Sequence, residues 1–293
     1  MAKISAKQVK ELRDMTGVGM MAAKKALMEV DGDIDKAVDF LRAKGVDTMA
    51  KKADRIAAEG LAATYVSGNT AAIVEVNSET DFVAKNESFQ EMVEKIVKTI
   101  VEQKPADNEA VLGLDVDGQT VKDLIIENTS KIGEKLSFRR FAILEKTDND
   151  VFGEYIHAGG RIAALVLVEG MQDEEMAKDV AMHVAAINPQ YVSADQVPQE
   201  VYDHEKQIQT EKSLAEGKPA NIVEKMVEGR MGKFLAEISL VDQPFVKDSA
   251  LTVAKYLAEK GGKAKSFVRF EVGEGMEKRN DDFAAEVASQ MGK

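Results

Sequence analysis

Asp81 and Phe82 are the residues whose types best suit a functional role, because they stand together in a polar loop, residues 77–86. Loops held by a rigid scaffold carry function more often than core residues do. An acid beside an aromatic can bind another protein, since the carboxylate offers charge and the ring fills an apolar gap. The alternative is structural, with Phe82 folding back to pin the loop onto its own core.

The sequence contains few of the motifs that enzymes use for covalent chemistry. No phosphate loop of the G-x-x-x-x-G-K-[ST] type occurs, and Gly17 and Gly19 are not followed by the third glycine of a dinucleotide fingerprint. A hydrolase using Asp81 and His157 is a weak hypothesis, because nothing in the sequence brings the two together. No metal site is expected from the histidines, which fall in three different predicted elements: His157, His183 and His204. These absences make an enzyme a weaker hypothesis without excluding one, and we expect no metal and no cofactor.

The composition is that of a charged globular protein of two or three domains. The 293 residues are 44% apolar and 31% charged, with a net charge of −12. So acidic a chain lacks the basic footprint of a nucleic-acid or anionic-membrane binder, and we expect neither partner. The absence of cysteine excludes disulfides and thiolate sites. Because Met1–Ser5 opens no apolar stretch of signal-peptide length and no apolar run could span a membrane, we predict a cytoplasmic protein.

Residues 1–54 are predicted to form a small module of three helices. Ser5 and Gln8 have the spacing of a capping box that opens the first helix, and the Thr-Gly-Val-Gly sequence at 16–19 ends it. Two further helices follow, the last with an end near Gly45. Residues 47–60 then indicate a helical connector. A unit this small seldom works as an enzyme by itself.

The central part of the chain predicts an α+β fold built from two copies of one unit. Residues 61–66 and 71–76 should pair as a β-hairpin, followed by a helix that a capping box at Ser88 opens, a second helix and a strand over 136–144. The same succession returns from a second hairpin over 151–168. We expect each copy to be a three-stranded antiparallel sheet with helices on one face. The copies are predicted to span 55–146 and, around an insert, 147–188 with 229–273.

The two copies differ in ways that bear on function. The second copy has Gly170–Glu174 where the first has Asp81 and Phe82, which weakens a purely structural role for Phe82. It also contains the insert, residues 189–228, whose two helices turn at residues 217–219 to make an antiparallel hairpin suited to self-association or partner contact. A C-terminal helical module, residues 274–293, completes the predicted organisation.

Several motifs, in order along nearly the whole chain, resemble the elongation factor Ts family. The resemblance implies a UBA-like amino-terminal module and, because the insert and the tail are present, the long bacterial form. Ala23 stands where some relatives have cysteine, a departure that does not touch the mechanism. The stretches that carry the resemblance are Val9–Arg13, Thr16–Met21, Lys24–Leu27, Glu75–Asn77, Thr80–Lys85, Met182–Ala186, Glu224–Met231, Gln243–Val246 and Arg269–Gly275.

The resemblance implies a partner and a site. The partner would be elongation factor Tu, the GTPase that delivers aminoacyl-tRNA, and the activity would be nucleotide exchange on it without covalent chemistry. In the family, an Asp-Phe pair reaches the GTPase near its magnesium site. That role falls here to Asp81 and Phe82, with Thr80 and Val83 beside them.

The resemblance also implies contacts outside this loop. The amino-terminal module would contact the same GTPase domain through Arg13, Met20 and Met21, and His157 would face another domain of the partner. The helical hairpin is implied to pair two copies in some members, as a homodimer or a two-plus-two complex. A binding-only adaptor is the alternative function, and it would tether partners while leaving nucleotide release unchanged.

Overall fold

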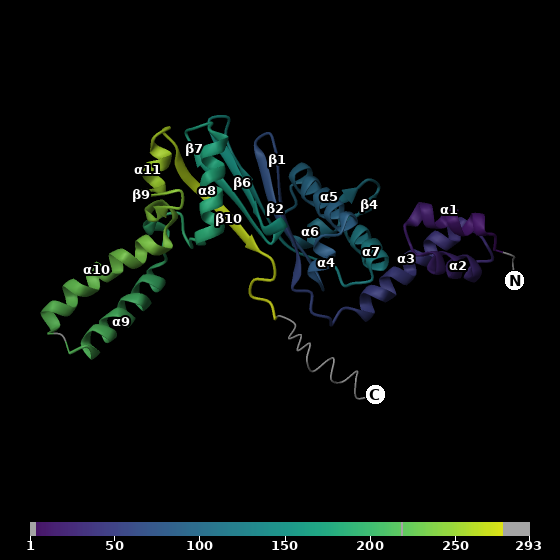
Figure 1. Ribbon diagram of the computed structural model, residues 1–293, viewed down its shortest axis with the longest axis horizontal. Helices are drawn as coiled ribbons and strands as arrows, with labels where there is room; N and C mark the ends of the chain where they lie inside the picture. The colour runs from purple at the N-terminus through teal and green to yellow at the C-terminus, as the bar shows by residue number, and fades with distance from the viewer. Residues whose placement is uncertain (1–3, 218, 278–293) are drawn as a thin grey trace.

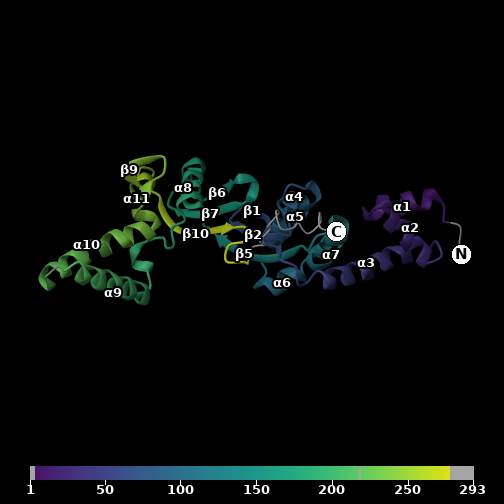
Figure 2. The same cartoon turned by 60° about the horizontal axis from the view of Figure 1, so that its bottom comes forward.

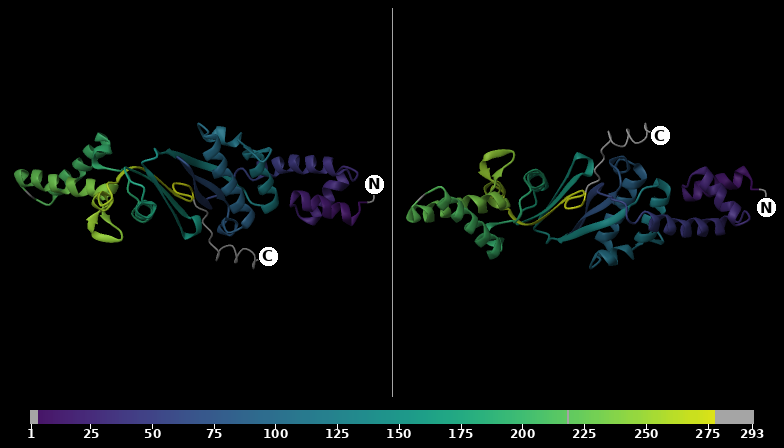
Figure 3. Two further views of the ribbon diagram at one scale, coloured as in Figure 1. Left: turned by 90° about the horizontal axis from the view of Figure 1, so that it is seen from above. Right: turned by 90° about the horizontal axis from the view of Figure 1, so that it is seen from below.

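The protein is elongated, with its N-terminal helices at one end and a helical hairpin at the other (Figures 1 and 3). The structure is a computed structural model that describes residues 4–217 and 219–277. Helices and small antiparallel sheets confirm the α+β class, while the domain boundaries stay predictions. The helix predicted within residues 274–293 lies beyond residue 277, outside the described residues.

Three helices form the N-terminal module: α1 (Ala6–Thr16), α2 (Met20–Glu29) and α3 (Ile34–Lys51). The predicted capping box is present, because Gln8 N donates to the Ser5 hydroxyl and Ser5 N donates to the Gln8 side chain. Gly17 ends α1 in the left-handed conformation, at φ 67°. Small and branched side chains fill the core between the helices, including Leu12, Ala23, Leu27 and Ala37.

The prediction that α3 ends near Gly45 is wrong, since the helix continues to Lys51 and only then gives way to a turn. Gly45 is buried against α7 (Val121–Ile132), where a Cβ atom would lie 2.8 Å from Ser130 Oγ and 2.9 Å from Ile126 Cγ2. The glycine therefore permits two helices to approach, and it does not terminate one. The same finding overturns the connector over 47–60, of which only the start is helical.

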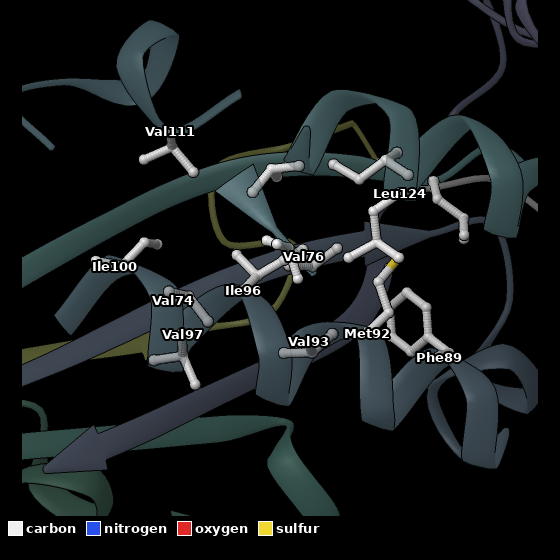
Figure 4. Close-up of a cluster of buried hydrophobic side chains, with 14 of the residues drawn as sticks. Val74, Val76, Phe89, Met92, Val93, Ile96, Val97, Ile100, Val111 and Leu124 are labelled. Atoms are coloured by element: carbon white, nitrogen blue, oxygen red, sulfur yellow. The ribbon is translucent and has the colours of Figure 1, made fainter. Parts of the chain in front are cut away.

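The first sheet contains β1 (Glu59–Ser67), β2 (Thr70–Ser78) and β5 (Ser137–Glu145), with β2 in the centre and both neighbours antiparallel to it. Helix α5 (Glu87–Gln103) and α7 cover one face, and apolar side chains fill the space between them (Figure 4). Short elements connect α5 to α7: α6 (Asn108–Leu112), β3 (Asp115–Val116) and β4 (Gln119–Thr120). The hairpin and the third strand predicted for the first copy are confirmed.

The start of α5 differs from the prediction. Asn86 is the N-cap, and its side-chain oxygen accepts from the backbone N–H groups of Ser88 and Phe89. The predicted capping box at Ser88 is therefore wrong, because the helix begins one residue earlier, at Glu87. A short polar side chain such as Asn caps a helix as well as Ser does, so composition alone could not choose between them.

The second sheet repeats the first in strand order. It contains β6 (Val151–His157), β7 (Ile162–Glu169) and β10 (Lys263–Glu271), with β7 in the centre and antiparallel to both. Helices α8 (Glu174–Ile187) and α11 (Val253–Ala258) cover its outer face, with the short strands β8 (Pro244–Phe245) and β9 (Asp248–Thr252) nearby. Thr120 caps α7 and Thr252 caps α11 in the same way.

The inner faces of the two sheets pack against each other. Ala71 and Ile73 of β2 share one apolar cluster with Ala163 and Leu165 of β7. The molecule thus has four layers here, with α5 and α7 on one side of the paired sheets and α8 and α11 on the other (Figure 2). Both central strands are consequently buried on both faces.

A buried carboxylate lies at one end of this interface. Glu75, on β2, is fully buried and accepts hydrogen bonds from Arg139 Nη1 (2.8 Å), Arg140 Nε (2.6 Å), Asn77 Nδ2 (3.1 Å) and Gly273 N (2.9 Å). Burial opposes its ionisation, but the donors at Gly273, Arg139, Asn77 and Arg140 prevail and lower the pKa of Glu75. Glu75 therefore joins β2 and β5 to the backbone that follows β10.

Replacing Glu75 with Gln should lower the free energy of unfolding by about 3 kcal/mol, because two arginines then lose the charge that compensates them. Urea unfolding at neutral pH measures this change. The control is Glu145→Gln, which breaks the exposed pair with Lys104 and should cost less than about 1 kcal/mol. Equal effects of the two substitutions would contradict the role given to Glu75.

The insert in the second copy is a hairpin of two long helices, α9 (Gln199–Ala215) and α10 (Ala220–Ile238), that project from the second sheet (Figure 1). Val227 and Met231 of α10 pack against Tyr202 of α9. The hairpin itself was predicted, but the boundary after residue 228 falls inside α10, which continues to Ile238. Short turns flank the pair: η2 (Ala194–Gln196) and η3 (Leu240–Asp242).

His183 joins α8 to the segment that follows the hairpin. Its ring is fully buried, Nδ1 accepts from Val246 N (3.1 Å), and Nε2 therefore carries the proton that goes to Gln243 Oε1 (2.8 Å). Gln243 in turn donates to the carbonyl of Glu237 in α10 (2.6 Å). Burial lowers the pKa of His183 below its ordinary value of 6.5, and the Gln243 contact opposes that shift.

Acidification should therefore destabilise this protein through His183. A depressed folded-state pKa means that the stabilisation is complete above the unfolded-state pKa of 6.5 and falls as the pH drops below it. The loss from this residue approaches about 1.4 kcal/mol per pH unit. Thermal or urea unfolding from pH 7 to pH 5 should show a steeper decline for the natural chain than for His183→Asn, which keeps an acceptor for Val246 but does not titrate. Parallel declines would exclude His183 as the cause.

Candidate functional site

The loop after β2 contains a single helical turn, α4 (Asp81–Ala84), which the sequence did not predict. Two backbone hydrogen bonds close it, from Lys85 N to Phe82 O (3.2 Å) and from Asn86 N to Val83 O (2.9 Å). The Ser78 hydroxyl donates to Thr80 O (2.9 Å), which ties the turn to the end of the strand. The loop is therefore an ordered structure between β2 and α5.

Neighbouring side chains of α4 point in opposite directions. Phe82 is 77% exposed, whereas Val83 is 7% exposed and belongs to the core between α5 and the first sheet. The structural alternative for Phe82 is thus wrong, because Val83 pins the turn and Phe82 stands in solvent. Val83 therefore anchors the turn in the free protein, while the partner contact expected of it stays a prediction.

Asp81 is exposed and forms an ion pair within the turn. Its Oδ2 lies 2.8 Å from Lys85 Nζ, four residues later. The hydrogen bond from Lys85 lowers the pKa of Asp81, so the carboxylate is ionised at neutral pH. Lys85 Nζ also lies 5.9 Å from the centroid of the Phe82 ring. Lys85 was not among the predicted site residues, although its spacing from Asp81 suits an ion pair on a helix.

Thr80 is held by a carboxylate from a distant part of the chain. Glu134, which follows α7, accepts from Thr80 N (2.9 Å) and from the Thr80 hydroxyl (2.7 Å). Beside it, Glu79 Oε1 accepts from Lys135 N (2.6 Å) and from Arg55 Nη1 (3.2 Å). No sequence signal pointed to Glu134 or Lys135, since neither belongs to a motif near the loop.

The N-terminal module presents an exposed apolar surface at the start of α2. Met20 is 61% and Met21 75% exposed, and Arg13 on α1 is exposed as well. Long, flexible methionine side chains adapt readily to a partner surface. The structure thus leaves all three side chains accessible for the contacts expected of them, which remain predictions.

His157 is exposed at the end of β6 and stacks on Tyr155, with 6.1 Å between the ring centroids. It belongs to the second sheet, whereas Asp81 follows the central strand of the first. Within residues 4–217 and 219–277, no hydrogen bond joins the two, and no group of three or more His, Cys, Asp or Glu side chains has a metal-binding arrangement. The hydrolase hypothesis gains no support from this geometry.

Comparisons with known proteins agree in one family. The family model described as "Elongation factor TS" matches residues 79–274, which includes the Asp81-Phe82 turn and ends just after β10. A relative from Pediococcus pentosaceus, described as "Elongation factor Ts", is 64% identical over all 293 residues and is covered along its full length. In the part of the chain that the structure describes, no helix combines the length and apolarity needed to cross a lipid bilayer.

The opposite environments of Phe82 and Val83 predict opposite effects on stability. Phe82→Ala should change the free energy of unfolding by less than about 0.5 kcal/mol, because the ring already contacts water. Val83→Ala should lower it by roughly 1–3 kcal/mol, since it removes buried methyl groups from the core. Denaturant unfolding of both variants checks this, and a larger loss for Phe82→Ala would show that the ring is packed on its own protein.

Proposed function

This chain belongs to the elongation factor Ts family, and on that premise we propose that it releases GDP from elongation factor Tu by inserting Phe82 near the bound magnesium and phosphates. Family membership makes it a translation elongation factor of the exchange-factor kind, which needs no covalent chemistry. We propose a cytoplasmic location, where translation takes place. The exposure of Phe82 on an ordered turn is the observation that carries the mechanism.

An exchange factor must favour a partner conformation in which the nucleotide has lost contacts. In GTPases of this type a magnesium ion bridges the nucleotide phosphates and protein oxygens, and it contributes much of the affinity for the nucleotide. An aromatic ring that fills an apolar gap between partner helices can hold those groups apart, as aromatic anchors do at interface centres. Because the α4 turn is already formed and Val83 is already buried, little order has to be gained on binding.

Asp81 serves as the polar partner of this ring. In the free protein its charge is paired with Lys85, at 2.8 Å and exposed to solvent. An exposed pair of this kind contributes little to stability, so either member can turn to the GTPase at small cost. We propose that Asp81 bonds to partner groups near the displaced ion without binding magnesium itself.

Further contacts enlarge the interface. We assign Arg13, Met20 and Met21 to the nucleotide-binding domain of the partner and His157 to another of its domains, as the family resemblance implies. The exposed apolar side chains of the hairpin, among them Ile208 and Leu214, suit the predicted pairing of two copies. Sedimentation at several concentrations tests that pairing.

Thermodynamic linkage makes the effect reciprocal. If this protein weakens nucleotide binding by about 5 kcal/mol, an affinity loss of several-thousand-fold, the nucleotide weakens binding of this protein equally. GTP, followed by aminoacyl-tRNA, would then separate the complex.

Stopped-flow release of a fluorescent GDP from elongation factor Tu, at fixed magnesium and subsaturating exchange factor, tests the proposal. The natural chain should accelerate release strongly. Phe82→Ala should lower the stimulated rate about 10- to 100-fold, the range expected when a central aromatic contact is lost. Asp81→Ala should lower it as well, by a smaller factor.

Ile187→Ala is the matched control, because it also removes an exposed apolar side chain, 47% exposed, but from the end of α8. It should leave GDP release at the rate of the natural chain. Full activity of Phe82→Ala would remove the ring from the mechanism. Binding of the natural chain without any acceleration would favour the adaptor.

A further inference from the structure

Three residues after α7 touch both the Phe82 loop and the polypeptide that leads out of the N-terminal module. We propose that this junction segment, Gly133–Lys135, is a positioning device that holds the two partner-binding surfaces in one rigid arrangement. The inference rests on the proposed function, because it assumes that both surfaces bind the same GTPase. It assigns positioning roles to Glu134 and Lys135, whose hydrogen bonds within the described residues go to the loop and to the linker, and not to Phe82 or the methionines of α2.

The junction segment holds the loop through both of its charged residues. The two carboxylate oxygens of Glu134 accept separately from the Thr80 backbone and hydroxyl, at 2.9 and 2.7 Å. The Thr80 hydroxyl donates to Glu134 and makes no capping bond to α4. Lys135 N donates to Glu79 at 2.6 Å. The residue immediately before Asp81 is thereby fixed by two charge-assisted bonds.

The junction segment also holds the chain that leaves α3. Lys135 Nζ donates to the carbonyls of Ala53 (2.5 Å) and Arg55 (2.9 Å), and Lys52 Nζ donates to the Gly133 carbonyl. Arg55 completes the connection, because its guanidinium reaches Glu79 at 3.2 Å. The linker, the junction segment and the loop therefore form one closed hydrogen-bonded network.

The packing of the N-terminal module on the core explains why such a network is needed. Helix α3 approaches α7 closely at Gly45, and Arg42 forms a half-exposed ion pair with Asp123 at 3.2 Å. Elsewhere the contact is incomplete, since a hollow of about 360 Å³ remains between α1, α3 and α7, lined by Met15, Leu41, Val46 and Ile126 among others. Because Gly45, Arg42 and Met49 all contact the core on one side of the hollow, we infer that the module can rotate about that side and that the network beyond the end of α3 restricts the rotation.

A rigid connection increases affinity, because two surfaces held in a fixed arrangement can contact the same partner together. When the first surface has bound, the second is already in place, and its ordering cost is reduced. When the connection is flexible, intact contact residues contribute less to the complex. Loss of the network should thus weaken exchange even though Phe82, Met20 and Met21 are unchanged.

The isolated protein allows a test that does not depend on exchange activity. Because the chain has no cysteine, spin labels can be placed at Lys25→Cys on α2 and Glu91→Cys on α5 alone, both at exposed positions. Lys135→Met, which retains the backbone bond to Glu79, should broaden the distance distribution between the labels. Glu134→Ala should speed hydrogen exchange of the amides in residues 78–86 about tenfold, the effect of losing a bond to a charged group. Glu134→Gln keeps one acceptor, so its rate of hydrogen exchange in residues 78–86 should lie between those of the natural chain and Glu134→Ala.

The exchange assay then tests the functional consequence. Lys135→Met and Glu134→Ala should each lower stimulated GDP release about tenfold at subsaturating concentration. The discriminating measurement is Met21→Ala made in two backgrounds, because a flexible module contributes less. Its effect should be smaller in the Lys135→Met chain than in the natural chain, a non-additivity that simple local destabilisation does not produce.

Lys95→Met is the matched control, since it breaks a lysine pair with Asp117 at 2.7 Å elsewhere on the core surface. It should change neither label distances nor exchange. Unchanged label distances in Lys135→Met, or strictly additive effects of Met21→Ala, would overturn the proposal. If the natural chain fails to accelerate GDP release, the proposed function fails, while the label distances still decide whether the junction segment fixes the module.

Discussion

Face-to-face packing of the two sheets is the constraint on which the rest of the structure depends. Ile73 and Leu165 lie on opposite central strands and meet in one apolar cluster, with small alanines around them that permit close approach. Since the inner faces are occupied, the helices of each copy can cover only the outer faces, which places α5 and α7 on one side and α8 and α11 on the other. The α4 turn follows the end of β2, so the packing of the two sheets determines where the turn lies. Glu75 joins the same strand to the backbone after β10.

Much of the local structure was predictable because its signals are local. The two hairpins and the capping box at Ser5 followed from alternation, turn residues and spacing, and they are confirmed. Packing of sheet on sheet was not predicted, although the nearly continuous apolar run of β7 is the pattern of a strand buried on both faces. The prediction that a helix ends near Gly45 was wrong because glycine occurs at close helix contacts as well as at helix ends. Only the position of α7 shows which of the two applies.

In the candidate site, too, the features with local sequence signals were predictable and those that depend on tertiary packing were not. The Asp81-Phe82 turn was found from residue types, and its ion pair with Lys85 has helical spacing, so both lie within the reach of sequence reasoning. Assigning Val83 to the core required the direction of each side chain in α4, a turn that no pattern had indicated. Glu134 lies 54 residues from Thr80, and such a pair becomes visible only in three dimensions. The same holds for His183 with Gln243, two residues from separate motifs that form one buried hydrogen bond.

The sandwich also has a consequence for biosynthesis. A chain made from its amino terminus completes the first sheet at Glu145, but the second sheet is complete only at Glu271. At ordinary rates of synthesis the interval is about 6–25 s, during which the inner face around Ala71 and Ile73 lacks its full cover. A nascent chain of this protein therefore passes through a stage, a little less than half of its synthesis, in which this apolar surface is incompletely covered and can adhere to other nascent chains.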